Sequence, residues 1–366
     1  MSRAKNNFDL LRLLAALQVA IIHGVEHMKI DMPQDWYSVA NWFPGVSIFF
    51  VISGYLISGA YLRSREVSSY ARNRILRIYP GLWVCFGATI LLMLYFHKLD
   101  GVSFWKIVPW VLGQLTIVPH TPDYLRTFGT GSVNGSLWTI PVELQFYLVL
   151  PLLMTFITRS MFRKVAVFAI LLLLGIGYLW IRREYDGRLP ARILLMCVLS
   201  WLYVFMVGVF LQINPAFVDR FVAGKFLWWL VGYVCWTMLL RRFGLPVEGN
   251  DATPLTTIPL GFLTISFALT APGVAEKLLR GNDISYGLYI YHMLVINVFV
   301  QIGQTGDVSK LAIAIALSLV LAMLSWRFVE APALRLKRNT QHPILNPQHE
   351  PAPPGPVDPQ ADSKAR

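Results

Sequence analysis

The sequence predicts an all-α integral membrane protein, a polytopic bundle of about ten transmembrane helices. The 366 residues are 55% hydrophobic and only 14% charged, with a mean hydropathy of +0.54, whereas soluble domains carry about 25% charged residues. The apolar residues gather in repeated runs of about 20, long enough to cross a bilayer. Because backbone polar groups in lipid must be satisfied within each segment, these runs predict helices.

The predicted spans follow one another along almost the whole chain. They lie at about 9–29, 43–62, 80–96, 136–157, 164–181, 192–212, 226–241, 255–271, 284–303 and 309–328. A further segment, 103–118, is apolar and aromatic but short, and fits either an interfacial helix or an extra span. Lysine and arginine favour the loops on the side of the N-terminus, with a basic exception at 182–192. This bias predicts that both termini are cytoplasmic.

The chain divides into a transmembrane domain at 1–335 and a tail at 336–366. The tail contains PAPPGP and has no apolar periodicity, so we expect it to be disordered. Arg12 interrupts the first apolar run and no small-residue cleavage site follows, so the first span should be retained. The net charge of +12 fits the excess of cytoplasmic cations. No basic domain lies outside the spans, so we expect no nucleic-acid partner.

The first span contains the densest set of ionisable residues, which cost about 2.5–3.5 kcal/mol each at the bilayer centre and are therefore functional candidates. They are Asp9, Arg12, His23, Glu26 and His27. Arg12 and His23 share a helix face and lie about 16 Å apart along the axis. Glu26 and His27 neighbour His23. A histidine beside a carboxylate is a minimal general base, and a histidine that packs against another helix is the alternative.

The same segment also fits a zinc pattern. His23-Gly24-Val25-Glu26-His27 matches the H-x-x-E-H motif of inverted metalloproteases, with Glu143 as a third ligand. A pattern of five residues is weak evidence, and we predict no metal. The cysteines lie in apolar runs without metal-ligand spacing, and we expect them to pack there: Cys85, Cys197 and Cys235.

Other polar residues lie in or beside later spans. Arg74 and Arg77 share a face if their segment is helical, and a planar guanidinium suits phosphate; ordinary cytoplasmic charge is the alternative. Glu143 lies inside an apolar run and needs a partner or a water-filled cavity. His292 is intramembrane, with tyrosines on neighbouring turns. Glu330 follows the last span, where we expect a surface position at a helix end, with a catalytic role as the alternative.

Together these segments resemble the membrane-bound acyltransferase 3 family of bacterial O-acyltransferases. The first span, FDLLRLLAALQVAIIH, is similar to the family's N-terminal signature of arginine, ten residues and histidine. Similar blocks follow in order: PGVSIFFVISGYLI at 44–57, RIYP at 77–80, W…ELQFY at 138–147, SY…LYIYH at 285–292 and FVEAP at 328–332. Pro141 and Leu144 depart from the usual residues, and Leu144 leaves Glu143 without an adjacent carboxylate.

The resemblance implies transfer of an acyl group, usually acetyl, from an acyl-CoA co-substrate to a sugar hydroxyl, with no other cofactor. The implied catalytic residues are His23, Glu143 and Glu26. The implied donor-binding residues are Arg12, Arg74 and Arg77. The candidate acceptor-site residues are Ser53, Tyr289 and His292. His23 would act as general base or carry the acyl group, and Glu26 or Glu143 would orient its ring.

The expected partners are acyl-CoA, a glycan or lipid-linked glycan and membrane lipids, and the expected location is the bacterial cytoplasmic membrane. A glycan or lipid transporter or flippase is the alternative class. It would explain the intramembrane charges but not the ordered blocks, and the chain lacks the internal repeat of many transporters. The acceptor glycan and the choice of acetyl or another short acyl group stay open.

Overall fold

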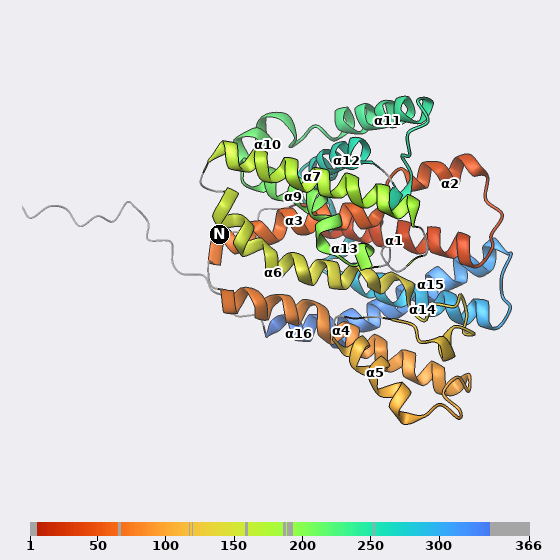
Figure 1. Ribbon diagram of the computed structural model, residues 1–366. Coiled ribbons are helices and arrows are strands. Elements are labelled where there is room, and N and C mark those ends of the chain that lie inside the picture. Colours follow the sequence, from red (N-terminus) through yellow and green to blue (C-terminus); the bar gives the residue numbers. More distant parts are fainter. Residues whose placement is uncertain are drawn as a thin grey trace, which may run out of the picture.

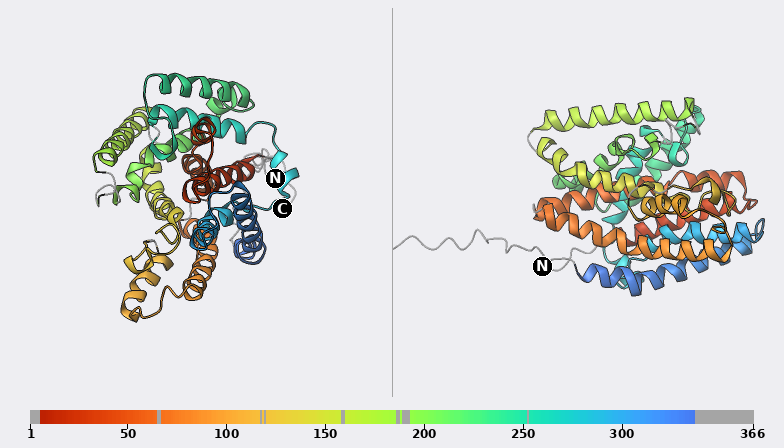
Figure 2. Two further views of the ribbon diagram at one scale, coloured as in Figure 1. Left: turned by 90° about the vertical axis from the view of Figure 1, so that its right-hand side faces the viewer. Right: turned by 60° about the horizontal axis from the view of Figure 1, so that its bottom comes forward.

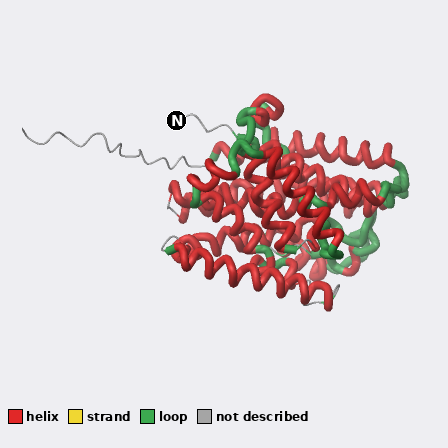
Figure 3. Tube along the Cα trace, turned by 90° about the horizontal axis from the view of Figure 1, so that it is seen from above, coloured by secondary structure: helices red, strands yellow, loops and turns green. Residues whose placement is uncertain are grey.

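Helices alone form the regular secondary structure that the computed structural model describes, and none of the described residues forms a strand (Figure 3). The described residues are 6–336 except 65–66, 117, 119, 158–159, 186–187, 189–192 and 252. The predicted all-α class is therefore confirmed. The predicted disordered tail lies outside the described residues from 337 onward.

Most of the longer helices run roughly along one common direction (Figures 1 and 2). The longer helices are α1 (Phe8–His27), α3 (Gly45–Ser64), α4 (Val67–Tyr95), α6 (Thr139–Ile157), α7 (Met161–Glu184), α9 (Leu202–Gln212), α11 (Phe226–Arg242), α12 (Pro254–Ala268), α14 (Ser285–Gln301) and α15 (Val308–Ser325). Of these, α11 and α12 lie obliquely to the common direction (Figures 1 and 2). The shorter helices are α2 (Gln34–Asn41), α5 (Phe104–Leu115), α10 (Pro215–Phe221), α13 (Val274–Leu279) and α16 (Ala331–Arg335). Single turns are η1 (Asp123–Leu125), η2 (Gly135–Trp138), η3 (Val198–Ser200), η4 (Gly249–Asp251) and the π-helical η5 (Trp326–Glu330).

Each predicted span coincides with a helix, but several of these helices are short for a crossing. Among the described residues, six helices are long and apolar enough to span a membrane, or up to seven if the bent pair α9 and α10 counts as one. Helices α11, α12 and α14 have 17, 15 and 17 residues. A multi-pass helical membrane protein is thus confirmed, whereas the count of ten and the cytoplasmic termini stay predictions.

The ambiguous segment at 103–118 forms α5, a helix of 12 residues. At 1.5 Å per residue it is about 18 Å long, well short of the roughly 30 Å of a bilayer core. Phe104 and Trp105 at its start are exposed, and aromatic side chains are enriched at membrane–water interfaces. The structure therefore favours the interfacial helix over the extra span.

Helix α1 lies near the middle of the bundle and runs parallel to α14 (Figure 2). Two side-chain contacts define their register, one from Arg12 to Asp283 and one from His23 to His292. Both helices therefore advance together from the arginine end toward the histidine end. The predicted topology requires this parallel arrangement, since it makes α1 the first span and α14 the ninth.

Helix α4 has the same direction as α14. The Tyr286 hydroxyl donates to the carbonyl oxygen of Ile78 at 2.8 Å, and the Cys85 thiol lies 3.3 Å from the carbonyl oxygen of Ile290. Helix α4 thus brings its arginines to the end of the bundle where α1 and α14 begin.

Helices α3 and α9 approach each other closely through two glycines. A Cβ atom on Gly54 would collide with the carbonyl oxygen of Phe205, and one on Gly208 would collide with that of Val51. Small residues allow backbones to approach in membrane bundles, where packing holds helices together. Ser53 and Gly54 are adjacent in α3. Gly54 allows the close packing of α3 on α9, whereas Ser53 lines a cavity between the helices.

Candidate active site

A cavity of about 90 Å³ lies between α1, α3, α4, α6 and α14, and we call it the central pocket. It brings together six of the residues that the sequence singled out: Arg12, Ser53, Arg74, Arg77, Glu143 and Tyr289. Its wall also includes apolar side chains such as Val46, Phe49 and Ile57. With three guanidinium groups and one carboxylate in the lining, the pocket favours an anionic ligand.

Asp283, which the sequence reasoning missed, organises two of the arginines. Its Oδ2 atom accepts hydrogen bonds from Arg77 at 2.5 Å and from Arg12 at 3.2 Å. The Ser285 hydroxyl donates to the other carboxylate oxygen at 2.5 Å. Burial raises the pKa of Asp283, but Arg77 and Arg12 outweigh this effect and hold the pKa below its ordinary value. Asp283 is thus an anion that fixes Arg12 and Arg77 at the pocket wall.

Arg74 differs from its neighbour Arg77 because it forms no ion pair among the described residues. Its guanidinium lies 5.8 Å from the centre of the Tyr147 ring. The Nε atom of Arg74 is buried and has no hydrogen-bond partner. A buried donor without a partner is costly, so Arg74 is the pocket cation best placed to take an external anion.

Glu143 forms its hydrogen bonds inside the central pocket. Its Oε1 atom accepts a bond of 2.9 Å from the Ser53 hydroxyl and another from the Tyr147 hydroxyl. The expectation that Glu143 orients His23 is therefore wrong in geometry, because its contacts lie on α3 and α6 instead. The reason is tertiary: α6 packs on α3 at this level, so Glu143 meets Ser53.

His23 has a histidine as its partner instead of a carboxylate. Its Nδ1 atom lies 3.0 Å from Nε2 of His292, and the two rings stack with centroids 5.2 Å apart. Nδ1 of His292 lies 3.2 Å from the carbonyl oxygen of Leu288. The expectation that Glu26 orients His23 is also wrong in geometry, because Glu26 accepts a 2.5 Å hydrogen bond from Tyr37. Glu26 is exposed at the end of α1, where α2 folds back over it.

Tyr289 connects the central pocket to the histidine pair. It lines the pocket, and its ring centroid lies 5.9 Å from that of His292 one turn further along α14. Its hydroxyl bonds to the Thr139 hydroxyl at 2.8 Å and to the Ser136 carbonyl oxygen at 2.9 Å. The candidate acceptor residues are therefore split: Ser53 and Tyr289 lie with the arginines, and the fully buried His292 lies with His23.

Two further buried polar residues were misread or missed from the sequence. Glu330 is only 2% exposed, which corrects the predicted surface position; η5 turns it inward, where Oε1 accepts from the Ser325 hydroxyl at 2.9 Å. Asn297 is completely buried and its side-chain amide donates to the carbonyl oxygens of Ser132 and Val133. A lone asparagine in an apolar run was a usable signal for Asn297. Asp283 offered none, because its partners are distant in sequence.

The zinc alternative lacks its third ligand. His23 and His27 have ring centroids 5.8 Å apart, but the described residues contain no group of three His, Cys, Asp or Glu side chains that could hold a metal ion. Glu143, the predicted third ligand, is hydrogen-bonded to Ser53 and Tyr147.

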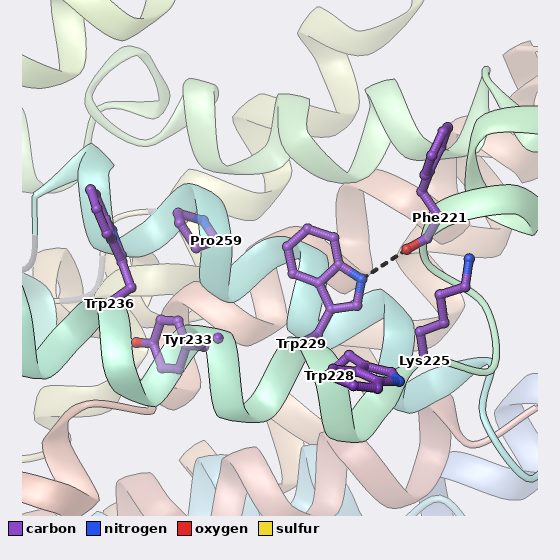
Figure 4. Close-up of a pocket in the computed structure, with 8 residues that line it drawn as sticks. Phe221, Lys225, Trp228, Trp229, Tyr233, Trp236 and Pro259 are labelled. Carbon is purple, nitrogen blue, oxygen red and sulfur yellow. Dashed lines mark hydrogen bonds between the residues drawn. The ribbon is translucent and has the colours of Figure 1, made fainter.

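A second cavity, of about 450 Å³, lies on the periphery over α11 and α12, and we call it the aromatic pocket (Figure 4). Its lining residues are Phe221, Lys225, Trp228, Trp229, Gly232, Tyr233, Trp236 and Pro259. The Trp229 indole donates to the Phe221 carbonyl oxygen at 3.0 Å, the bond dashed in Figure 4. Lys225 is the one charged residue of this lining, so the aromatic pocket offers no acid–base pair.

The fold and the central pocket define a multi-pass membrane protein with a cationic pocket, and Tyr289 of its lining lies one turn of α14 before the histidine pair. The chain belongs to the acyltransferase family whose model, described as "Acyltransferase domain", matches residues 5–327. The protein is therefore an acyltransferase, and the family resemblance predicted from the ordered blocks is confirmed.

The chain is similar to several proteins, including two that are named as O-acetyltransferases. The chain is 31% identical over 361 residues to Nodulation protein 10 of Rhizobium leguminosarum bv. viciae, which covers 91% of this chain and 94% of that protein. It is 26% identical over 338 residues to an O-acetyl transferase of Shigella phage Sf6, covering 89% and 95%. It is 23% identical over 369 residues to Peptidoglycan O-acetyltransferase OatA of Listeria monocytogenes, covering 89% of this chain but 55% of that protein. No solved structure matches the chain.

Proposed function

We propose that the protein transfers an acyl group, acetyl by default, from cytoplasmic acyl-CoA to a hydroxyl of a cell-envelope or exported polysaccharide. The observation that carries this proposal is the order of groups along α14, where the arginine-bound Asp283 precedes the central pocket and His292 follows it. The names of the phage and Listeria relatives support a hydroxyl acceptor on a glycan.

The arginines of the central pocket are the proposed donor site. CoA is a polyphosphate anion, and a guanidinium binds two phosphate oxygens at once. Arg74 has no competing ion pair among the described residues, and Arg12 and Arg77 keep further N–H donors beyond those that Asp283 accepts. Since α14 rises about 1.5 Å per residue, Ser285 at its start and His292 are separated by roughly 10 Å along its axis. The arm of the donor would follow this path past Tyr289, so that the thioester reaches the histidine pair.

His23 is the proposed base. It takes the proton of the acceptor hydroxyl while the hydroxyl oxygen attacks the carbonyl carbon of the thioester. The C–O bond forms as the C–S bond breaks, and the sulfur leaves with the bonding electron pair. The proton then passes from the imidazolium to the thiolate, which leaves an ester and a free thiol. An acyl group carried by His23 itself is the alternative form of the same proposal.

The site also has a proposed orientation. Acyl-CoA is cytoplasmic, so we place the start of α1, α4 and α14 at the inner face of the bacterial cytoplasmic membrane. Glu26 and His27 then lie toward the outer face, where an exported glycan or a lipid-linked glycan would enter. Membrane lipids surround the bundle in this arrangement.

Acyl transfer in detergent tests the proposal. Purified protein receives labelled acetyl-CoA and a glycan, and labelled glycan is measured. His23→Ala should lower product formation by at least about 10²–10⁴-fold, the usual contribution of a general base. His97→Ala is the matched control, because its side chain is 79% exposed and lies outside the central pocket. Near-normal turnover of His23→Ala would remove the mechanism. A wild-type protein that forms no product would favour the transporter alternative, since transport leaves no product in detergent.

A further inference from the structure

The contacts of the histidine pair determine which ring nitrogen carries each proton. Nδ1 of His292 faces the Leu288 carbonyl oxygen at 3.2 Å, and a carbonyl oxygen can only accept. Nδ1 of His292 must therefore carry a hydrogen. The carbonyl oxygen has two lone pairs, so it can accept this bond in addition to its bond within the helix.

The second nitrogen of His292 is then fixed as well. His292 is completely buried and none of its described contacts is a carboxylate, so a charged ring would be costly there. A neutral ring with hydrogen on Nδ1 has a lone pair on Nε2. That lone pair faces Nδ1 of His23 at 3.0 Å, so Nδ1 of His23 must donate. None of the described contacts of His23 is a carboxylate either, so its ring is also neutral, and its remaining nitrogen, Nε2, carries no proton.

We propose that His292 is a positioning residue that holds His23 in the tautomer with hydrogen on Nδ1, which makes Nε2 of His23 the reactive atom. The inference rests on the proposed function, since it names the atom that would serve as base. The Leu288 carbonyl oxygen can only accept, and this determines the tautomer of His292. The tautomer of His292 in turn determines that of His23, which has its lone pair on Nε2. This assigns His292 to the base, and removes it from the acceptor site that the sequence suggested.

His292 takes the place of the carboxylate that usually orients a catalytic histidine. A carboxylate beside His23 would place a full charge in the membrane interior, whereas a neutral imidazole avoids that cost. When Nε2 of His23 takes up a proton, the bond from its Nδ1–H to His292 becomes charge-assisted and therefore stronger. The arrangement thus still favours the imidazolium that forms during transfer.

Nitrogen-15 NMR of histidine-labelled full-length protein tests the assignment directly, because protonated and unprotonated imidazole nitrogens have well-separated shifts. The signals of His23 are identified by their loss in His23→Gln. We expect hydrogen on Nδ1 and none on Nε2 in the wild-type protein at neutral pH. His292→Phe keeps a ring but removes the acceptor, so His23 should then populate both tautomers. A wild-type His23 with hydrogen on Nε2 would overturn the proposal.

Kinetics provide a second measurement. His292→Phe should lower kcat by about 10- to 100-fold, as for other residues that orient a catalytic histidine, with the donor KM unchanged. His292→Gln should recover part of kcat, since its amide oxygen can accept from Nδ1 of His23. Equal losses in both variants would indicate a packing role and contradict the proposal. A wild-type protein without transferase activity would refute the proposed function, while the NMR result would still stand or fall by itself.

Discussion

The central pocket and the aromatic pocket are both cavities between helices, but the first is lined by several charged side chains and the second mainly by aromatic ones. The central pocket is the smaller, at about 90 Å³ against about 450 Å³, and it lies where five helices of the bundle meet. Its lining contains three arginines and a glutamate. The aromatic pocket is lined by tryptophan, tyrosine and phenylalanine side chains with Lys225 alone as a charge, and Trp228 is 82% exposed.

Buried charge therefore indicates the position of the site better than cavity size does. Aromatic side chains on the periphery of a membrane bundle make favourable contacts with lipid, so a large aromatic cavity there does not require a catalytic role. Ionisable groups in the interior are costly and persist where they are paired or functional. If this is correct, charge in the central pocket supports the reaction and charge in the aromatic pocket does not.

The largest effect should follow from removing Asp283. Asp283→Ala leaves Arg12 and Arg77 without their shared carboxylate, and breaking a buried ion pair in this way costs about 3–5 kcal/mol of unfolding free energy. We expect a lower thermal unfolding midpoint in detergent and loss of acyl transfer. Asp31→Ala is the control, because Asp31 is an exposed acid outside the central pocket. An Asp283→Ala protein as stable as Asp31→Ala would show that the ion pairs do not hold the pocket together.

A smaller and more selective effect is expected at Arg74. Removal of one charge-assisted hydrogen bond costs about 1.5–3 kcal/mol, so Arg74→Ala should raise the donor KM by about 10- to 100-fold and leave the acceptor KM unchanged. Arg74→Lys should recover only part, because lysine lacks the two-pronged geometry. Arg72→Ala, which alters an exposed residue of the same helix, is the control. Equal donor KM values for Arg72→Ala and Arg74→Ala would show that the donor does not bind in the central pocket.

Hydropathy predicted the helices of this fold well, because a bilayer imposes one length and one secondary structure on every crossing. Hydropathy did not predict the ends of helices that extend beyond their apolar segments. The third span was predicted to begin at residue 80, yet α4 begins at Val67 and continues through Pro80. Proline is tolerated inside membrane helices, since neighbouring groups satisfy the freed backbone. The sixth span was likewise predicted to begin at residue 192, yet α9 begins at Leu202.

The sequence predicted which residues form the site, but not which of them pair with each other through ion pairs or hydrogen bonds. The cost of charge in a membrane identified Arg12 from the sequence alone, and the fit of a guanidinium to phosphate identified Arg74 and Arg77. The sequence reasoning treated Arg74 and Arg77 alike. Asp283, 206 residues beyond Arg77, pairs with that arginine, whereas Arg74 forms no ion pair with any residue that the structure describes. The partner of His23 was expected to be Glu26 or Glu143 and is a histidine 269 residues away. Such pairings depend on which helices are neighbours, which hydropathy does not encode.

The smallest effect should come from the cation of the aromatic pocket. The Lys225 ammonium donates to the backbone carbonyl oxygen of Arg220 and lies 5.7 Å from the Phe221 ring centre, in contacts at the protein surface. Surface substitutions of this kind change stability by about 0.5 kcal/mol or less, which corresponds to about a twofold change in an equilibrium constant. Lys225→Ala should therefore leave the donor KM, the acceptor KM and kcat within about twofold of wild type. Like Arg74→Ala, it removes one cation beside a cavity, so the two variants differ only in the pocket affected. A rise in donor KM as large as that of Arg74→Ala would mean that the larger cavity takes part in donor binding, and the comparison on which the site assignment rests would fail.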